Sequence, residues 1–225
     1  MSFREELNRQ YAALGVSEQV IALGEEAERK CCGRFADIDR ISDLNQMKVL
    51  QAFRDNRVSE AHLMPSTGYG YNDIGRDTLE QVYASVFHTE DALVRSQLVS
   101  GTHALAIALS GNLRPGDEIM SPVGKPYDTL DEVIGIRPAR GSLREYGVTY
   151  RQADLREDGS FDFDAVRNAL TEKTRLVEIQ RSKGYAARRT LSVAEIGELI
   201  SFIKSIRPDV ICMVDNCYGE FVETS

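Results

Sequence analysis

The sequence lacks the features of several common protein classes. Acidic residues outnumber basic ones by 35 to 27, and the isoelectric point is near 5.0. This balance argues against a surface for nucleic acid or for anionic lipid. No apolar run reaches the length of a membrane span, and the first residues resemble neither a secretory signal nor a transit peptide. We therefore expect a cytoplasmic protein that binds neither nucleic acid nor membranes.

Cysteine and histidine are scarce. The four cysteines are Cys31, Cys32, Cys212 and Cys217, and their spacing is typical of neither a zinc site nor a disulfide framework. We expect reduced thiols, with the adjacent pair Cys31 and Cys32 packed on a helix. With three histidines and no clustered carboxylates, the sequence predicts no metal site.

The first quarter of the chain has the pattern of helices. Over residues 2–56, apolar residues from Val20 to Leu50 recur close to the period of a helix face. This segment has too little apolar surface to stand alone, so we expect it to pack on another domain or subunit. We assign residues 1–60 to a helical N-terminal segment and residues 61–225 to the domain that follows.

From residue 76 onward, helical patterns alternate with short apolar runs. Helices are expected at 76–87, 100–109, 127–135, 163–170 and 192–206, and strands at 92–96, 116–122, 148–155, 175–180 and 210–215. Strands that alternate with helices of about ten residues are typical of parallel sheets. The sequence therefore predicts an α/β fold with a mostly parallel sheet and helices on both of its faces.

A carboxylate stands at the end of the last apolar run. Asp215 directly follows the run from Val210 to Val214. Ligands of parallel α/β sheets bind beyond the carboxyl ends of the strands. Two interpretations are open: the carboxylate caps the next turn through Asn216, or it is held in place to meet a cation.

A second motif at this edge, SGTHAL at residues 100–105, lies at a strand-to-helix junction. Gly101 lets a ligand approach the backbone closely, and the free N–H groups of a first helical turn suit a phosphate. Ser100 and Thr102 add hydroxyl donors. The same residues are also an ordinary helix N-cap, so both interpretations stand.

Two further motifs carry aromatic residues. In GKPYDTL, residues 124–130, Tyr127 begins a helix, where it can stack on a flat heteroaromatic ring or simply fill the core. GYGYNDIGRD, residues 68–77, is a glycine-rich loop with Tyr69 and Tyr71, either functional or a structural turn. Together with Asp215, these motifs describe a phosphorylated aromatic ring with a basic nitrogen. That ligand is pyridoxal 5′-phosphate, whose protonated ring serves as an electron sink.

The order of the motifs carries a family resemblance. SGTHALA, GYGYNDIGRD, QRSKGY and VDNCYGEF together resemble the fold-type-I pyridoxal-phosphate enzymes of cysteine and methionine metabolism. Among these the sequence is most similar to the methionine gamma-lyase-like family, also called aluminium resistance proteins. The resemblance covers the whole chain. It implies the front part of the large cofactor-binding domain, in a homodimer or homotetramer, with the remainder and a small C-terminal domain outside these residues.

The resemblance implies two catalytic residues and a phosphate cradle. Asp215 matches the aspartate that pairs with the pyridine nitrogen, and Tyr127 matches the tyrosine that stacks on the ring. Gly101 and Thr102 match the backbone cradle of the phosphate, to which Ser100 is adjacent.

Other cofactor contacts are implied less specifically. Tyr69 or Tyr71 matches a tyrosine that reaches the phosphate of the neighbouring subunit, and the glycine-rich spacing leaves the choice open. Residues 180–182 fall where such enzymes contact the ring hydroxyl. Ser182 stands there where many relatives carry asparagine.

The lysine that holds the cofactor covalently in these enzymes is not at its family position. In the family it follows the aspartate, and no lysine follows Asp215. Lys125 and Lys183 fall on the same edge of the sheet but at other positions. We expect the active lysine beyond residue 225 in a longer enzyme, and no catalysis by these residues alone.

The function implied is that of a pyridoxal-phosphate-dependent carbon–sulfur lyase acting on a sulfur amino acid, by a methionine gamma-lyase-like elimination. Beta-elimination, aldol cleavage and transamination on the same scaffold are alternatives. A non-catalytic metal-stress protein and a nucleotide-binding protein are others. The sequence has neither clustered oxygen ligands for a trivalent cation nor a G-x-G-x-x-G fingerprint, which disfavours both of these.

Overall fold

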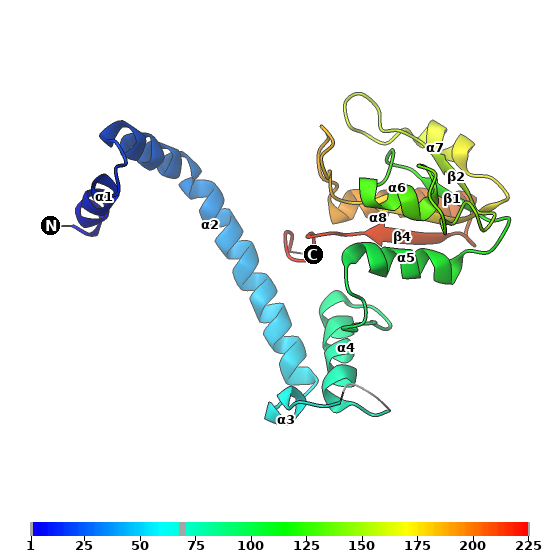
Figure 1. Ribbon diagram of the computed structural model, residues 1–225, viewed down its shortest axis with the longest axis horizontal. Helices are drawn as coiled ribbons and strands as arrows, with labels where there is room; N and C mark the ends of the chain where they lie inside the picture. The colour runs from blue at the N-terminus through cyan, green and yellow to red at the C-terminus, as the bar shows by residue number, and fades with distance from the viewer. Residues whose placement is uncertain (1, 68–70, 225) are drawn as a thin grey trace.

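The computed structural model describes residues 2–67 and 71–224, so Tyr69 lies outside the described residues. Helices and strands follow one another along the chain as Figure 1 shows. The helices are α1 (Phe3–Ala13), α2 (Glu18–Asp55), α3 (Glu60–Leu63), α4 (Ile74–Phe87), α5 (Gly101–Asn112), α6 (Asp128–Ile134), α7 (Phe163–Ala169) and α8 (Val193–Ile206). The strands are β1 (Glu118–Ser121), β2 (Thr149–Gln152), β3 (Thr174–Gln180) and β4 (Ile211–Asp215).

The four strands form one parallel sheet in the order β2-β1-β3-β4. One helix connects each strand to the next in the chain: α6, then α7, then α8. All four strands therefore end at the same edge of the sheet. At that edge Gln180 of β3 is in register with Asp215 of β4. The predicted α/β fold with a parallel sheet is confirmed.

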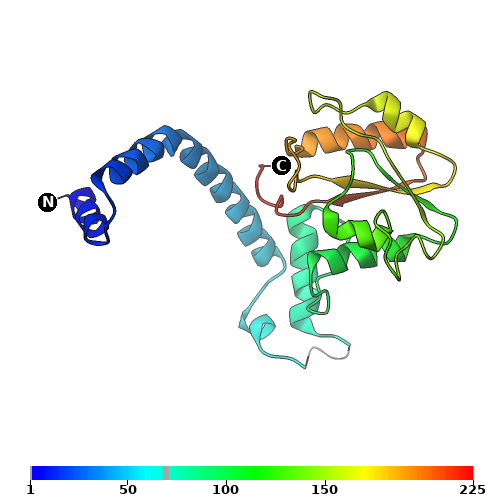
Figure 2. The same ribbon diagram turned by 45° about the horizontal axis from the view of Figure 1, so that its top comes forward.

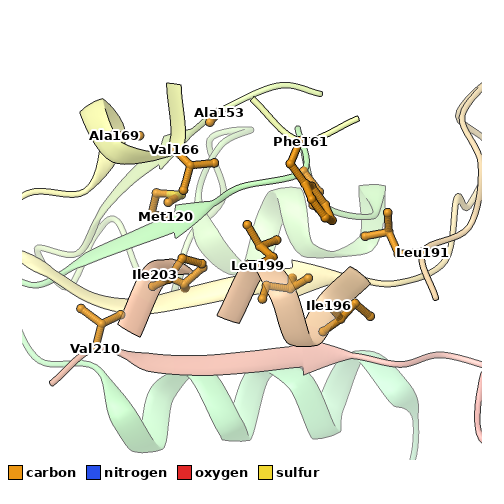
Figure 3. Close-up of a cluster of buried hydrophobic side chains, with 13 residues drawn as sticks. Met120, Ala153, Phe161, Val166, Ala169, Leu191, Ile196, Leu199, Ile203 and Val210 are labelled. Atoms are coloured by element: carbon orange, nitrogen blue, oxygen red, sulfur yellow. The ribbon is translucent and has the colours of Figure 1, made fainter. Parts of the chain in front are cut away.

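Helices cover both faces of the sheet, as predicted (Figures 1 and 2). On one face, Met120 of β1 and Val177 of β3 pack against α7 and α8 in a cluster that Figure 3 shows from the side. On the other face, Ile119 and Leu176 pack against α5 and α6. These four strand residues are completely buried, and each contributes about 1.5–3 kcal/mol of transfer free energy. Because successive side chains of a strand point to opposite faces of the sheet, the apolar strand residues form one core on each face.

The prediction of a strand at residues 92–96 is wrong. This stretch runs outside the sheet without regular structure. Its backbone forms a hydrogen bond with a side chain instead of with a neighbouring strand: the N–H of Val94 donates to Glu80 Oε1 at 2.9 Å. Arg95 forms an ion pair with the same carboxylate. Two polar bonds to α4 thus take the place of a ladder, and the short apolar run does not enter a core.

The helical N-terminal segment is confirmed as α1 and the 38-residue α2. In Figures 1 and 2 both helices project away from the sheet. The C-terminal half of α2 packs on the body, through Ala52 against Val82 and Val86 of α4 and through the buried Asn45, which donates to the carbonyls of Phe221 and Glu223. Exposed large apolar side chains follow the rest of α2: Val20, Leu23, Phe35, Ile38, Leu44, Met47, Leu50 and Phe53.

All four cysteines are free thiols. Cys31 and Cys32 lie on a helix, α2, as expected. The expectation that they pack against other residues is wrong, because both are exposed on the part of α2 that projects away from the sheet. Within residues 2–67 and 71–224, none of the helices combines the length and the apolar character that a membrane span requires.

Candidate functional site

A cavity of about 740 Å³ opens where β3 and β4 end, between the start of α5 and the start of α6. We call it the edge cavity. Six residues selected from the sequence line it: Ser100, Gly101, Thr102, Tyr127, Ser182 and Asp215. They come from four separate segments of the chain, and the parallel sheet brings them together because the carboxyl ends of its strands share one edge.

Asp215 is the buried acid of this cavity. It ends β4, and only 9% of its surface is exposed. Burial raises the pKa of its carboxyl group, the charge of Glu220 adds to the rise, and the backbone N–H of Cys217 partly opposes it. A cation in the cavity would stabilise the ionised form.

The start of α5 presents free backbone donors to the cavity. Ser100 caps the helix, its hydroxyl accepting the N–H of His103 at 3.1 Å. In the described part of the chain, the N–H groups of Gly101 and Thr102 have no acceptor. A Cβ atom placed on Gly101 would meet nothing within 4 Å. Open space beside free N–H groups at a helix N-terminus suits an anion.

Tyr127 stands at the start of α6, half-buried, with its ring toward the loop after β3. It stacks on Tyr185, with 5.9 Å between ring centroids and 30° between planes. The Tyr185 hydroxyl raises the pKa of the Tyr127 phenol, which therefore stays neutral. Gly184 has φ +54°, and a Cβ there would lie 3.1 Å from Tyr127 Cδ2. A glycine is needed at this position because the loop passes directly beside the ring.

Ser182 lies in that same loop. Its carbonyl oxygen accepts bonds from Gln180 Nε2 at 2.9 Å and from Arg188 Nη2 at 2.5 Å, which fix the backbone at the cavity wall. Of the residues 180–182, Ser182 lines the edge cavity, whereas Gln180 lines a neighbouring cavity of about 790 Å³.

The two lysines at this edge differ in their surroundings. Lys183 is exposed and lines the edge cavity. Lys125 does not line it, and its ammonium group donates to Asp131 Oδ2 at 2.7 Å. Tyr71 does not line the edge cavity either, and 98% of its surface is exposed.

The cavity wall also contains residues that the sequence patterns did not indicate: Thr129, Tyr185, Thr190, Cys217 and Tyr218. Thr129 accepts a hydrogen bond of 3.1 Å from the Thr102 hydroxyl, which joins α5 to α6 across the cavity. Cys217 and Tyr218 directly follow the aspartate in the motif VDNCYGEF, and this adjacency was the signal that pointed to them.

A second buried acid, Glu178, was also missed. It lies on β3 with no exposed surface, and the Ser121 hydroxyl donates to its Oε2 at 3.3 Å. Its Oε1 has no partner among the described residues. Burial, and then the charge of Asp215, raise the pKa of Glu178 to about 8. An acid inside the apolar run RLVEIQ was the signal available in the sequence.

The donor groups of the edge cavity suit pyridoxal phosphate. Free N–H groups at the start of α5 suit a phosphate, and Tyr127 offers an aromatic face. The buried carboxylate of Asp215 is short of a cationic partner, which a protonated ring nitrogen supplies. The phosphate, the ring face and the ring nitrogen of the cofactor therefore each have a matching group on the wall.

Comparison with known proteins agrees with this fit. The sequence profile of the methionine gamma-lyase family matches residues 20–225. An uncharacterised protein of Bacillus subtilis, YnbB, is 52% identical over 200 residues, which are 88% of this chain and 48% of YnbB.

Two solved structures are similar over nearly the whole chain. A candidate cystathionine beta-lyase involved in aluminium resistance, from Clostridium acetobutylicum, is 45% identical with a TM-score of 0.92, covering 100% of this chain and 54% of that one. A carbon–sulfur lyase involved in aluminium resistance, from Clostridium novyi, is 47% identical with a TM-score of 0.92, covering 98% and 53%. The chain thus spans about half the length of these relatives, and it belongs to the methionine gamma-lyase family of pyridoxal-phosphate enzymes.

Proposed function

We propose that the protein is a pyridoxal-phosphate-dependent carbon–sulfur lyase acting on a sulfur amino acid. The observation that carries the proposal is the edge cavity, where the buried carboxylate of Asp215 and the free N–H groups of α5 line one space. The relative from Clostridium novyi is described as a carbon–sulfur lyase, which supports the same reaction class.

Each wall residue has a proposed task in holding the cofactor. The N–H groups of Gly101 and Thr102 bind the phosphate, with the Ser100 hydroxyl beside them. Tyr127 stacks on the ring, and Ser182 lies beside the ring hydroxyl. Asp215 holds a proton on the ring nitrogen. We propose further that Tyr69 or Tyr71 reaches the phosphate of a neighbouring subunit.

Pyridoxal phosphate supplies an electron sink for the negative charge that develops on the substrate when a bond to its α-carbon breaks. The chain's contribution is electrostatic and steric. Asp215, once ionised, stabilises the positive charge of the ring nitrogen, and burial strengthens that interaction because little water screens it. Tyr127 holds the ring in one orientation, and its neutral phenol adds no charge that competes with the phosphate.

The proposal predicts where the cofactor is attached. Borohydride treatment of the full-length protein with pyridoxal phosphate should label one lysine outside residues 1–225, identified by peptide mass. The unlabelled protein should show the visible absorbance of a bound cofactor, and should release a 2-oxo acid from L-methionine or L-cystathionine. Stoichiometric labelling of Lys183, which lines the edge cavity, would instead place the active lysine within this chain. Absence of any visible band would refute the function.

The phosphate site predicts a selective loss of cofactor affinity in Gly101→Val. A Cβ atom at this position meets no protein atom within 4 Å, so we expect the valine side chain to occupy the space assigned to the phosphate while the fold is kept. Losing one bond to a charged group costs about 1.5–3 kcal/mol, or roughly a 10- to 100-fold rise in the cofactor dissociation constant. The control is Gly111→Val at the other end of α5, where a Cβ also meets nothing. Equal affinities in both variants would argue against the site.

We also propose a homodimer or homotetramer, in which residues 1–60 form an association segment beside the cofactor domain of residues 61–225. The apolar side chains exposed along α2 support this, because a soluble monomer rarely leaves so long a stripe uncovered. Leu44→Glu should weaken association, as sedimentation at several concentrations would measure. Gln19→Glu adds the same charge on α2 at an exposed polar position and serves as the control. A wild-type monomer that keeps full activity on dilution would contradict the proposal.

A further inference from the structure

One guanidinium group is buried at the end of β3. Arg181 follows the strand directly, and only 3% of its surface is exposed. A buried charge is costly unless it is paired and hydrogen-bonded. Here the guanidinium has partners in two other segments: Arg181 Nε donates to the Leu191 carbonyl at 3.1 Å, and Nη2 is paired with the carboxylate of Glu223.

Its remaining bonds go to the turn that follows Asp215. Arg181 Nη1 donates to Asn216 Oδ1 at 2.8 Å and to the Gly219 carbonyl at 2.6 Å. The backbone N–H of Arg181 donates to the carbonyl of Asp215 at 2.9 Å. The arginine therefore holds the residue before the turn, the first residue of the turn and its last.

The turn in question contributes directly to the edge cavity. Cys217 and Tyr218 line it, and Tyr218 holds a left-handed φ of 62° that an isolated residue rarely adopts. Asp215, which lines the same cavity, directly precedes this turn. The position of its carboxylate in the cavity wall thus depends on how the turn is held.

We infer that Arg181 is a positioning residue for Asp215: its guanidinium fixes the 216–219 turn and its backbone N–H holds the Asp215 carbonyl, so that the carboxylate keeps its place in the wall of the edge cavity. The planar fork of arginine is suited to this task, because it bonds acceptors in several fixed directions at once, whereas a lysine ammonium on a flexible stem does not. The inference rests on the proposed function, in which Asp215 is the partner of the cofactor nitrogen.

The fit between turn and guanidinium is close. A Cβ atom on Gly219 would lie 2.6 Å from Arg181 Nη1 and 2.6 Å from Asn216 Oδ1. An alanine at this position therefore cannot be accommodated unless the turn or the guanidinium shifts. Gly219→Ala thus disturbs the same contact from the opposite side while the buried charge stays in place.

The test uses the full-length holoenzyme loaded with pyridoxal phosphate that carries ¹⁵N in its ring. The ¹⁵N chemical shift reports protonation of the ring nitrogen, and thermal unfolding reports the fold. Arg181→Lys should keep the cofactor bound but move the ring-nitrogen signal toward that of the unprotonated ring. With L-methionine or L-cystathionine as substrate, kcat should fall roughly 10- to 100-fold, as small misplacements of catalytic groups do, with KM changed much less.

Arg189→Lys is the matched control. Arg189 lies in the same loop, is partly exposed, and is paired with Glu195 at 2.5 Å instead of with the turn, so its signal and kcat should be those of wild type. A wild-type ring-nitrogen signal and kcat in Arg181→Lys would overturn the inference. If Arg181→Lys fails to fold, the same measurement is made on Gly219→Ala. A shifted ring-nitrogen signal in that variant supports the inference, and an unchanged signal overturns it.

The proposed function is tested separately by Asp215→Asn in the same experiment. If that variant shifts the signal and Arg181→Lys does not, the function stands and the positioning role falls. If wild type shows no protonated ring nitrogen, or if Asp215→Asn leaves the signal unchanged, the nitrogen partnership of Asp215 fails and the inference fails with it.

Discussion

Asp215→Asn in the full-length enzyme is expected to lower kcat by about 10²- to 10⁴-fold while the protein still folds. Asparagine has the shape of aspartate but cannot balance the charge of a protonated ring nitrogen. Removing one partner of a buried ion pair costs about 3–5 kcal/mol, and each 1.36 kcal/mol of lost transition-state stabilisation is a tenfold change in rate. Initial rates of 2-oxo acid release would measure the effect.

The stability of the cofactor-free variant separates this effect from misfolding. Burial raises the pKa of Asp215, so its ionised form is unfavourable in the folded protein without a cation. Asp215→Asn removes that cost, and the melting temperature of the cofactor-free protein should not fall. Asp209→Asn is the control, because Asp209 precedes the same strand, is exposed and is paired with Arg207. Full activity in Asp215→Asn would refute the assignment.

The stability of the cofactor-free protein should fall as the pH rises from about 4.5 to 8, through Glu178. The pKa of this carboxyl is raised from 4.5 to about 8 in the folded state. The folded protein therefore holds a proton that the unfolded chain releases above pH 4.5, so the stabilisation is complete below that pH and is lost on the way to pH 8. The size of the effect is on the order of 4 kcal/mol in the free energy of unfolding.

Glu178→Gln should remove this part of the pH dependence, because glutamine is neutral throughout. The quantity to measure is the difference between variant and wild type in urea unfolding at several pH values and constant ionic strength. The groups that act on Glu178 are Asp215, Arg188 and the Ser121 hydroxyl, and all three remain in the variant. Glu198→Gln, at an exposed position of α8, is the control. A wild-type slope that persists in Glu178→Gln would show that other groups cause it.

The sequence alone was sufficient for the fold class and for most of the candidate site. The helical period of residues 2–56 and the apolar runs that became β1, β2, β3 and β4 are local patterns, and each was borne out. The failed strand at 92–96 shows the limit of such patterns. Whether a short apolar run joins a sheet depends on a partner strand, and here Glu80 of α4 binds its backbone instead.

Only the tertiary structure decided which residues share the edge cavity and which lie outside it. Thr129, Tyr185 and Thr190 line it although nothing in their local sequence demanded it, whereas Tyr71 is exposed. The reason is that membership of a cavity depends on contacts between segments far apart in the chain.

The same holds for the environments of buried charges. The raised pKa of Glu178 and the bonds of Arg181 arise from burial and from partners up to 57 residues away. Propensity and period describe neighbours along one helix or strand, so they identify Asp215 as the last residue of a buried strand. The packing of β3 against β4 and of the turn against Arg181 determines which groups surround that carboxylate, and those groups set its charge and its direction.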